Sequence, residues 1–265
     1  MPHLISHFLS KFLLNKTSAA LLLLGLTSLL NAVYAQSSCS SDKQPRASAL
    51  VERFLMADCG DCWGKAPASK SPAPPITLDW IVPTKGDDAA LSAAAVRDSL
   101  TRLGSAQVPN GQTLERRKAS TPATGKTPAA LPPVPPVRLR VAHGLGFNGY
   151  IGTSIGLYSA SSGAKALKKW PQGMTAHLAL IENLPAGAEG SPIARNLVRN
   201  YQMSPLNGQS MLYKKEREGE QIFFDSRPLS VPEGAKPERL AVVGWLEDAQ
   251  GNVLQAVGSK CAVPL

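Results

Sequence analysis

A proline-rich stretch at residues 119–136 most strongly limits what this chain can fold into. It contains six prolines, at positions 122, 128, 132, 133, 135 and 136. Proline has no backbone N–H and cannot continue a helix or a central strand, so such a stretch favours an extended polyproline conformation. We therefore expect a semi-rigid linker at 119–136 between a domain at 36–118 and a second domain at 137–265.

Residues 1–35 have the features of a secretory signal peptide. Two lysines precede an apolar run at 19–30, and Val33 and Ala35 place small residues at −3 and −1 of a cleavage point. A retained membrane anchor is the alternative, but the apolar run is short for a bilayer core of roughly 30 Å. We therefore expect cleavage after Ala35, no membrane span in the mature chain, and a periplasmic or secreted protein.

The charge of the chain is positive but scattered. The formal net charge is +9, and the short basic groups at 116–118, 168–169 and 214–215 do not form a stripe on one predicted element. Short groups of this kind are typical of a solvated surface, and an exported protein meets little nucleic acid. We therefore expect no nucleic-acid partner.

The segment before the proline-rich stretch alternates strand and helix patterns. Residues 76–82 are typical of a strand, and residues 49–57 fit a strand or, equally, one short helix. Residues 87–103 show helical spacing of apolar side chains and are followed by Gly104, a frequent helix stop. This order predicts a small α/β unit.

The segment after the proline-rich stretch has a period of two. Its candidate strands lie at 137–142, 150–158, 175–181, 210–215, 221–224, 239–247 and 253–257. Short strands separated by Gly, Pro and Asn turns predict an antiparallel, β-sandwich-like domain.

The most informative motif is Cys59-Gly60-Asp61-Cys62. In a CxxC motif one thiolate can attack a substrate disulfide and the other can resolve the mixed disulfide. We therefore predict Cys59 as the attacking sulfur and Cys62 as the resolving one, with an unidentified protein thiol or disulfide as partner. The alternatives are a structural disulfide or half of a metal site. Asp58 and Asp61 flank Cys59, and their charges disfavour a thiolate.

The other two cysteines, Cys39 and Cys261, lie near the two ends of the mature chain. In an oxidising compartment we expect them to pair, although a bond from Cys39 to Cys59 or Cys62 is an open alternative. Outside the leader the chain has only two histidines, His143 and His177, and both fall in predicted β structure. We therefore expect no metal ion and no cofactor.

Two glycine motifs resemble catalytic signatures without their context. Residues 144–149 fit GxGxxG and residues 152–156 fit GxSxG, but alternating β sequence follows where each signature requires a helix. A glycine-rich hairpin is the better interpretation of both.

A family resemblance extends over most of the mature chain. Residues 50–55, followed by the CxxC motif, resemble the opening of a group of secreted bacterial thioredoxin-like proteins classed as domain of unknown function 1223. Residues 78–80 are similar to the second strand of that family, residues 187–199 to its later loop and strand, and residues 239–257 to its closing hairpin. The resemblance implies a thioredoxin-like fold before the linker, but no reaction is established for the family.

Two functions therefore remain open. The first is a thiol–disulfide redox role in the cell envelope through Cys59 and Cys62. The second is a non-enzymatic binding or interaction module, in which the Cys59–Cys62 disulfide is structural and the β domain forms the contact surface. The sequence does not decide whether the protein is an enzyme.

Overall fold

The computed structural model describes residues 39–47, 49–65, 75–86, 88–119, 137–159, 173–206, 211–216 and 219–261. All of them belong to one compact unit, Ser37–Leu265. The predicted leader at 1–35, its cleavage point and residues 120–136 of the proline-rich stretch lie outside the described residues. No helix in the described part is long and apolar enough to cross a membrane.

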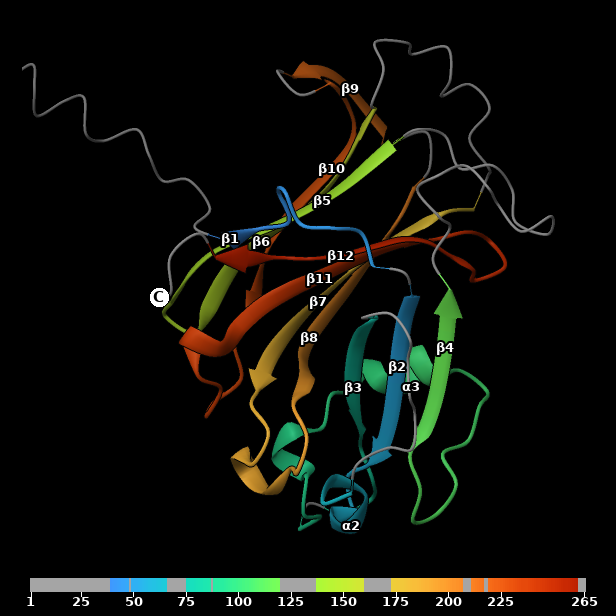
Figure 1. The fold of residues 1–265 in the computed structure, drawn as a ribbon, viewed down its shortest axis with the longest axis vertical. Coiled ribbons are helices and arrows are strands. Elements are labelled where there is room, and N and C mark those ends of the chain that lie inside the picture. Colours follow the sequence, from blue (N-terminus) through green and yellow to red (C-terminus); the bar gives the residue numbers. More distant parts are fainter. Residues whose placement is uncertain are drawn as a thin grey trace, which may run out of the picture. The chain divides into compact units, whose positions relative to one another are not determined.

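Two β-sheets make up the fold (Figure 1). The first, sheet A, has six strands in the order β13-β1-β5-β6-β10-β9, and every neighbouring pair is antiparallel. Its strands are β1 (Cys39–Ser40), β5 (Val137–Phe147), β6 (Tyr150–Ser159), β9 (Met211–Glu216), β10 (Gly219–Ser230) and β13 (Lys260–Cys261).

Sheet B has seven strands in the order β12-β11-β7-β8-β3-β2-β4. The pairs β2–β3 and β3–β8 are parallel and the others are antiparallel. Its strands are β2 (Ala49–Met56), β3 (Ile76–Val82), β4 (Leu114–Ala119), β7 (Thr175–Leu184), β8 (Arg195–Pro205), β11 (Leu240–Glu247) and β12 (Val253–Gly258).

The predicted fold class, an α/β thioredoxin-like unit followed by an antiparallel β-sandwich-like domain, is wrong. Strands dominate the described residues, and the α-helices there are α2 (Gly60–Trp63) and α3 (Asp98–Leu103). Sheet B joins strands from both sides of the proline-rich stretch, because β3 pairs with β8. The β-x-β-α order of the sequence is local, whereas the sheet that β2 and β3 enter also contains four strands from beyond the proline-rich stretch, β7, β8, β11 and β12.

The helix predicted at 87–103 forms only in its last six residues. A short 3-10 turn at Ser92–Ala94 precedes it, and Asp87 lies outside the described residues. The amide of Leu91 donates to the carbonyl of Ala57 (2.9 Å) and that of Val96 to the carbonyl of Ile81 (3.1 Å). These amides bond to the C-terminal ends of β2 and β3 instead of to a helical turn, so the segment covers these strand ends as a loop.

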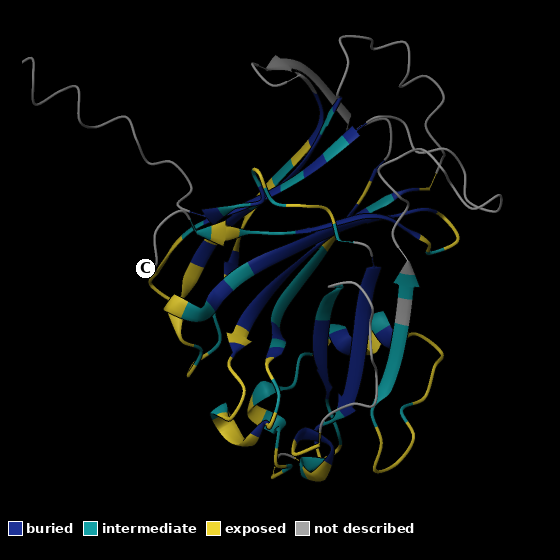
Figure 2. Cartoon of the chain, in the orientation of Figure 1, coloured by how far each residue is buried: buried dark blue, intermediate teal, exposed yellow. Residues whose placement is uncertain are grey.

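The main core lies between the two sheets and contains apolar side chains from β5, β6 and β10 of sheet A and from β7, β11 and β12 of sheet B. In Figure 2, β7 and β11 are coloured as buried along most of their length. A second core, on the opposite face of sheet B, contains Phe54, Trp80 and Trp245 under Leu103 of α3. Both faces of sheet B are therefore covered, which explains why β2 and β3 are buried along most of their length and are mainly apolar.

The strand predictions after the proline-rich stretch are largely confirmed. The segment carrying GxGxxG and GxSxG is the β5–β6 hairpin, whose turn residues Asn148 and Gly149 both have positive φ. Asp248 closes the β11–β12 turn by accepting hydrogen bonds from the amides of Gln250 and Asn252. These hairpins were recognisable because turn chemistry is local.

Gly244 on β11 permits the close approach of sheet A. A Cβ built at this position would collide with the Cγ1 of Val141 on β5. We expect Gly244→Ala to lower the free energy of unfolding by about 1–3 kcal/mol, because the packed core must shift. Gly152→Ala on β6 is the matched control, since its Cβ meets no heavy atom within 4 Å. Urea unfolding of both variants measures the difference, and equal stabilities would contradict this account.

Candidate functional site

The Cys59–Cys62 pair lies directly after β2. The amide of Ala57 still bonds to β3, donating to the carbonyl of Val82 (2.9 Å), and the amide of Cys59 then turns back to the carbonyl of Met56 (3.0 Å). The four-residue helix α2 follows, beyond the ends of β2 and β3 and away from sheet A (Figure 1). The two cysteines form a disulfide with their Cα atoms 5.2 Å apart.

The two cysteines differ in exposure. Cys62 is buried, with 4% of its surface exposed, in a small apolar cluster that includes Ile81, Leu184 and Leu197. Cys59 is half-buried at the edge of the same cluster. An external thiol or disulfide therefore meets the Cys59 end of the bond first.

The next residue, Trp63, anchors α2 to the body of the protein. Its indole Nε1 donates to the carbonyl oxygen of Glu189 (2.8 Å). The guanidinium of Arg195 lies over its ring at 4.4 Å, and Nη2 of Arg195 donates to the carbonyls of Trp63 (2.9 Å) and Lys65 (3.2 Å). The C-terminal end of α2 is thus held by an arginine of β8.

Arg195 is itself fixed by a buried carboxylate, Asp79 on β3. Nη1 of Arg195 lies 3.0 Å from Oδ1 of Asp79, and Nη2 of Arg53 on β2 donates to Oδ2 (3.0 Å). The amide of Asn196 also donates to Oδ2 of Asp79 (3.1 Å). Since β3 and β8 share one paired position, Asp79 with Leu197, the Asp79 side chain takes over much of the bonding between these strands.

Burial dominates the electrostatics of this ion-pair cluster. Loss of solvent raises the pKa of Asp79, although Arg53, Arg195 and the Asn196 amide act in the opposite direction. Burial also lowers the pKa of Arg195, against the attraction of Asp79. The cluster therefore costs desolvation energy, and its strands and α2 stay in place because every charge retains its partners.

The chemical surroundings of Cys59 do not favour a strongly reactive thiol. Asp58 and Asp61 are both exposed beside it, and their negative charges oppose thiolate formation. The helix α2 spans four residues, too few for a helix dipole of useful size. Cys59 is accessible from one side, and α2 is held in place by Trp63 and Arg195. Any reactivity of the pair therefore depends on the accessibility of Cys59 and not on an unusually acidic thiol.

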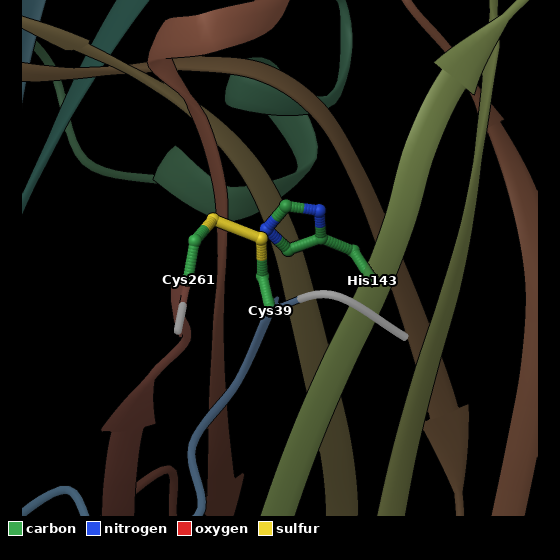
Figure 3. Close-up of side chains that lie close together, drawn as sticks. All are labelled: Cys39, His143 and Cys261. Atoms are coloured by element: carbon green, nitrogen blue, oxygen red, sulfur yellow. A yellow bond between two sulfur atoms is a disulfide. The ribbon is translucent and has the colours of Figure 1, made fainter. Parts of the chain in front are cut away.

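The other two cysteines lie at the edge of sheet A. Cys39 on β1 is directly opposite Cys261 on β13, and a disulfide joins them with their Cα atoms 3.9 Å apart. Cys39 is also opposite His143 on β5. The three residues therefore form a row across three neighbouring strands (Figure 3).

A second buried ionic network lies on the α3 side of sheet B. Arg102 of α3 donates to both carboxylate oxygens of Glu52 (2.6 and 2.9 Å) and also to Glu247. Nδ1 of His177 lies 2.6 Å from the hydroxyl of Tyr201, and its Nε2 lies 3.4 Å from Oε2 of Glu247. Glu52, Glu247 and His177 are all at least 94% buried.

Burial and hydrogen bonding shift the pKa values in this network, and their balance differs between Glu247 and His177. Burial raises the pKa of Glu247, but hydrogen bonds from His177 and Arg102 outweigh it and hold that pKa well below its usual value. Burial lowers the pKa of His177 despite the nearby Glu247. The charged Glu247 is thus matched by Arg102, and this network fastens α3 to the sheet.

No family model matches the chain, and no curated protein matches it. Two solved structures are similar at low levels. A domain of the outer membrane lipoprotein Omp28 from Porphyromonas gingivalis shares 14% identity and a TM-score of 0.29, over 49% of this chain and 90% of that one. HBP35 of Porphyromonas gingivalis shares 12% identity and a TM-score of 0.41, over 82% of this chain and 75% of that one. Neither similarity assigns a function here.

Sequence reasoning missed Asp79, Arg195 and Arg53 as supports of the CxxC segment. Asp79 is an acid at the centre of an otherwise mainly apolar strand, ITLDWIV. A buried carboxylate in such a strand requires a cationic partner, so Asp79 was the residue from which a buried ion pair could have been predicted. Its partners on β2 and β8 were not identifiable, since they depend on which strands become neighbours.

Proposed function

We propose that this chain is an exported cell-envelope protein that exchanges disulfides with other proteins through Cys59 and Cys62. The observation that carries the proposal is the difference in exposure within the pair, with Cys59 half-buried and Cys62 buried. This asymmetry suits an attacking sulfur at position 59 and a resolving sulfur at position 62. The leader-like residues 1–35 support a periplasmic or secreted location.

The reaction begins with the reduced pair. The Cys59 thiolate attacks a partner disulfide, forming a mixed disulfide and releasing the first partner sulfur as a thiolate. The Cys62 thiolate then attacks Cys59, which releases the second partner sulfur and re-forms the Cys59–Cys62 bond. The partner gains two electrons and this chain loses two, so a dithiol reductant must restore the pair.

Single-cysteine variants test this division of roles. In Cys62→Ser, we expect the remaining Cys59 thiol to form a mixed disulfide with a small aromatic disulfide probe. In Cys59→Ser, we expect Cys62 to react on the order of tenfold more slowly, because its sulfur is less accessible. Both variants keep the Cys39–Cys261 bond and serve as controls for each other. Equal rates, or no reaction at Cys59, would reject the proposal.

The second candidate, a non-enzymatic binding module, rests on a different surface. The β5–β6 hairpin exposes large apolar side chains at its tip, namely Leu145 (61%), Phe147 (77%) and Tyr150 (56%). Exposed apolar groups gathered on one hairpin are typical of interaction sites. A redox phenotype that depends on Cys59 and not on this hairpin would favour the first function over the second.

A further inference from the structure

The row formed by Cys261, Cys39 and His143 brings three potential metal-ligand atoms close together. One ligand atom of each residue, the two sulfurs and a ring nitrogen, lies within 4.8 Å of the other two. Figure 3 shows the imidazole of His143 with a ring nitrogen directed at the sulfur of Cys39. Two sulfurs and one imidazole nitrogen are a known ligand set for Zn²⁺, with a fourth position left for water.

The orientation of His143 supplies an independent observation. Its Nδ1 lies 2.9 Å from the carbonyl oxygen of Gly144 and can donate only to it, which leaves the lone pair on Nε2. His143 is 1% exposed, and its Nε2 has no hydrogen-bond partner among the described residues. A buried nitrogen without a partner requires an explanation. A histidine whose other nitrogen is fixed by a backbone carbonyl is the arrangement found at metal sites.

We propose that, once the Cys39–Cys261 disulfide is reduced, Cys39, Cys261 and His143 bind a thiolate-preferring metal ion such as Zn²⁺. A dithiol reductant transfers two electrons to the disulfide and becomes a disulfide itself, which leaves two thiols. Each thiol then loses its proton and bonds to the metal ion, so binding releases about two protons per ion. The site is therefore a redox-gated metal site, closed in the oxidised protein and open in the reduced one.

The strand geometry is compatible with this exchange. β13 is two residues long and pairs with β1 alone among the described strands, so it can adjust when the S–S bond opens. Cys39 and His143 remain paired through the β1–β5 register, independently of β13. The proposal does not involve Cys59 or Cys62 and stands or falls separately from the proposed function.

Cobalt provides a direct probe, because Co²⁺ in a tetrahedral thiolate site has strong visible and charge-transfer absorption. The titration uses the full mature chain carrying Cys59→Ser and Cys62→Ser, so that the CxxC pair supplies no thiolate. After reduction with a phosphine under anaerobic conditions, we expect one Co²⁺ per chain with thiolate bands, displaced by Zn²⁺. The oxidised protein should give no such bands.

His143→Gln separates a metal site from two reduced thiols alone. Loss of an outer-shell partner typically weakens metal binding by about 10- to 100-fold, and loss of a ligand should weaken it at least as much. Circular dichroism follows the fold in parallel. If the reduced chain unfolds and Zn²⁺ restores the fold, the proposal is supported. Absence of thiolate bands, unchanged affinity in His143→Gln, or a reduced chain that unfolds regardless of Zn²⁺ would overturn it.

Discussion

Replacing Asp79 with asparagine should lower the free energy of unfolding by about 3–5 kcal/mol. The substitution keeps the shape of the side chain but removes the one negative charge between Arg53 and Arg195, whose polar atoms lie 3.0 Å from it. Both arginines would then be buried without an anion. The free-energy cost of these two unpaired charges exceeds the net stabilisation that the ion pairs with Asp79 provided. Equilibrium urea unfolding followed by circular dichroism measures the change.

The matched control is Glu189→Gln, also a carboxylate-to-amide change next to an arginine. Glu189 lies 3.3 Å from Arg239, and its side chain is 43% exposed. Exposed ion pairs contribute about 0–1 kcal/mol, so the control should be nearly neutral. If both variants lose the same small amount, the Asp79 cluster does not hold β3 and β8 together as described.

Removing the Cys39–Cys261 disulfide should destabilise the protein far more than removing Cys59–Cys62. The first bond joins residues 222 positions apart and the second joins residues 3 apart. Chain-entropy estimates give about 5 kcal/mol for the long loop and about 2 kcal/mol for the short one. The comparison uses two double variants, Cys39→Ala with Cys261→Ala and Cys59→Ala with Cys62→Ala.

Urea unfolding of the two double variants under identical conditions gives the difference directly. A larger loss in the Cys59–Cys62 variant would mean that the CxxC bond has a structural role beyond its small loop. That result would favour the binding-module candidate, in which the CxxC disulfide only holds α2 in place.

The apolar pattern predicted strands that contain a single buried acid, such as β3 and β11, and missed β4 and β8, which each contain at least two basic residues. The alternating pattern did not predict β8, because Arg195 and Arg199 interrupt it, although the family resemblance implied a strand within 187–199. Both arginines have buried carboxylate partners, Asp79 and Glu182. β4 was missed for the same reason, since its Arg116 and Lys118 form ion pairs with Glu52 on β2 and Glu247 on β11. In a sequence, charged residues indicate a solvated surface. Their buried partners lie on other strands, so the sequence alone does not reveal that these charges are paired.

The candidate sites also differ in whether the sequence could reveal them. The CxxC motif was visible because its spacing is local. The row of Cys39, His143 and Cys261 was not, because no spacing links a cysteine at 39 to a histidine at 143. Only the position of the two-residue strand β1 between β5 and β13 brings them together. Strands of this length give no periodic signal in a sequence.

The Cys39–Cys261 bond also determines how this protein transmits mechanical load. A pull applied to chain segments outside these two residues passes through one covalent S–S bond and two adjacent strands. The hydrogen bonds of both sheets are then shielded from tension, and the enclosed residues cannot be drawn out as an extended chain. In the oxidised state the protein can therefore be stretched from its ends without being unravelled.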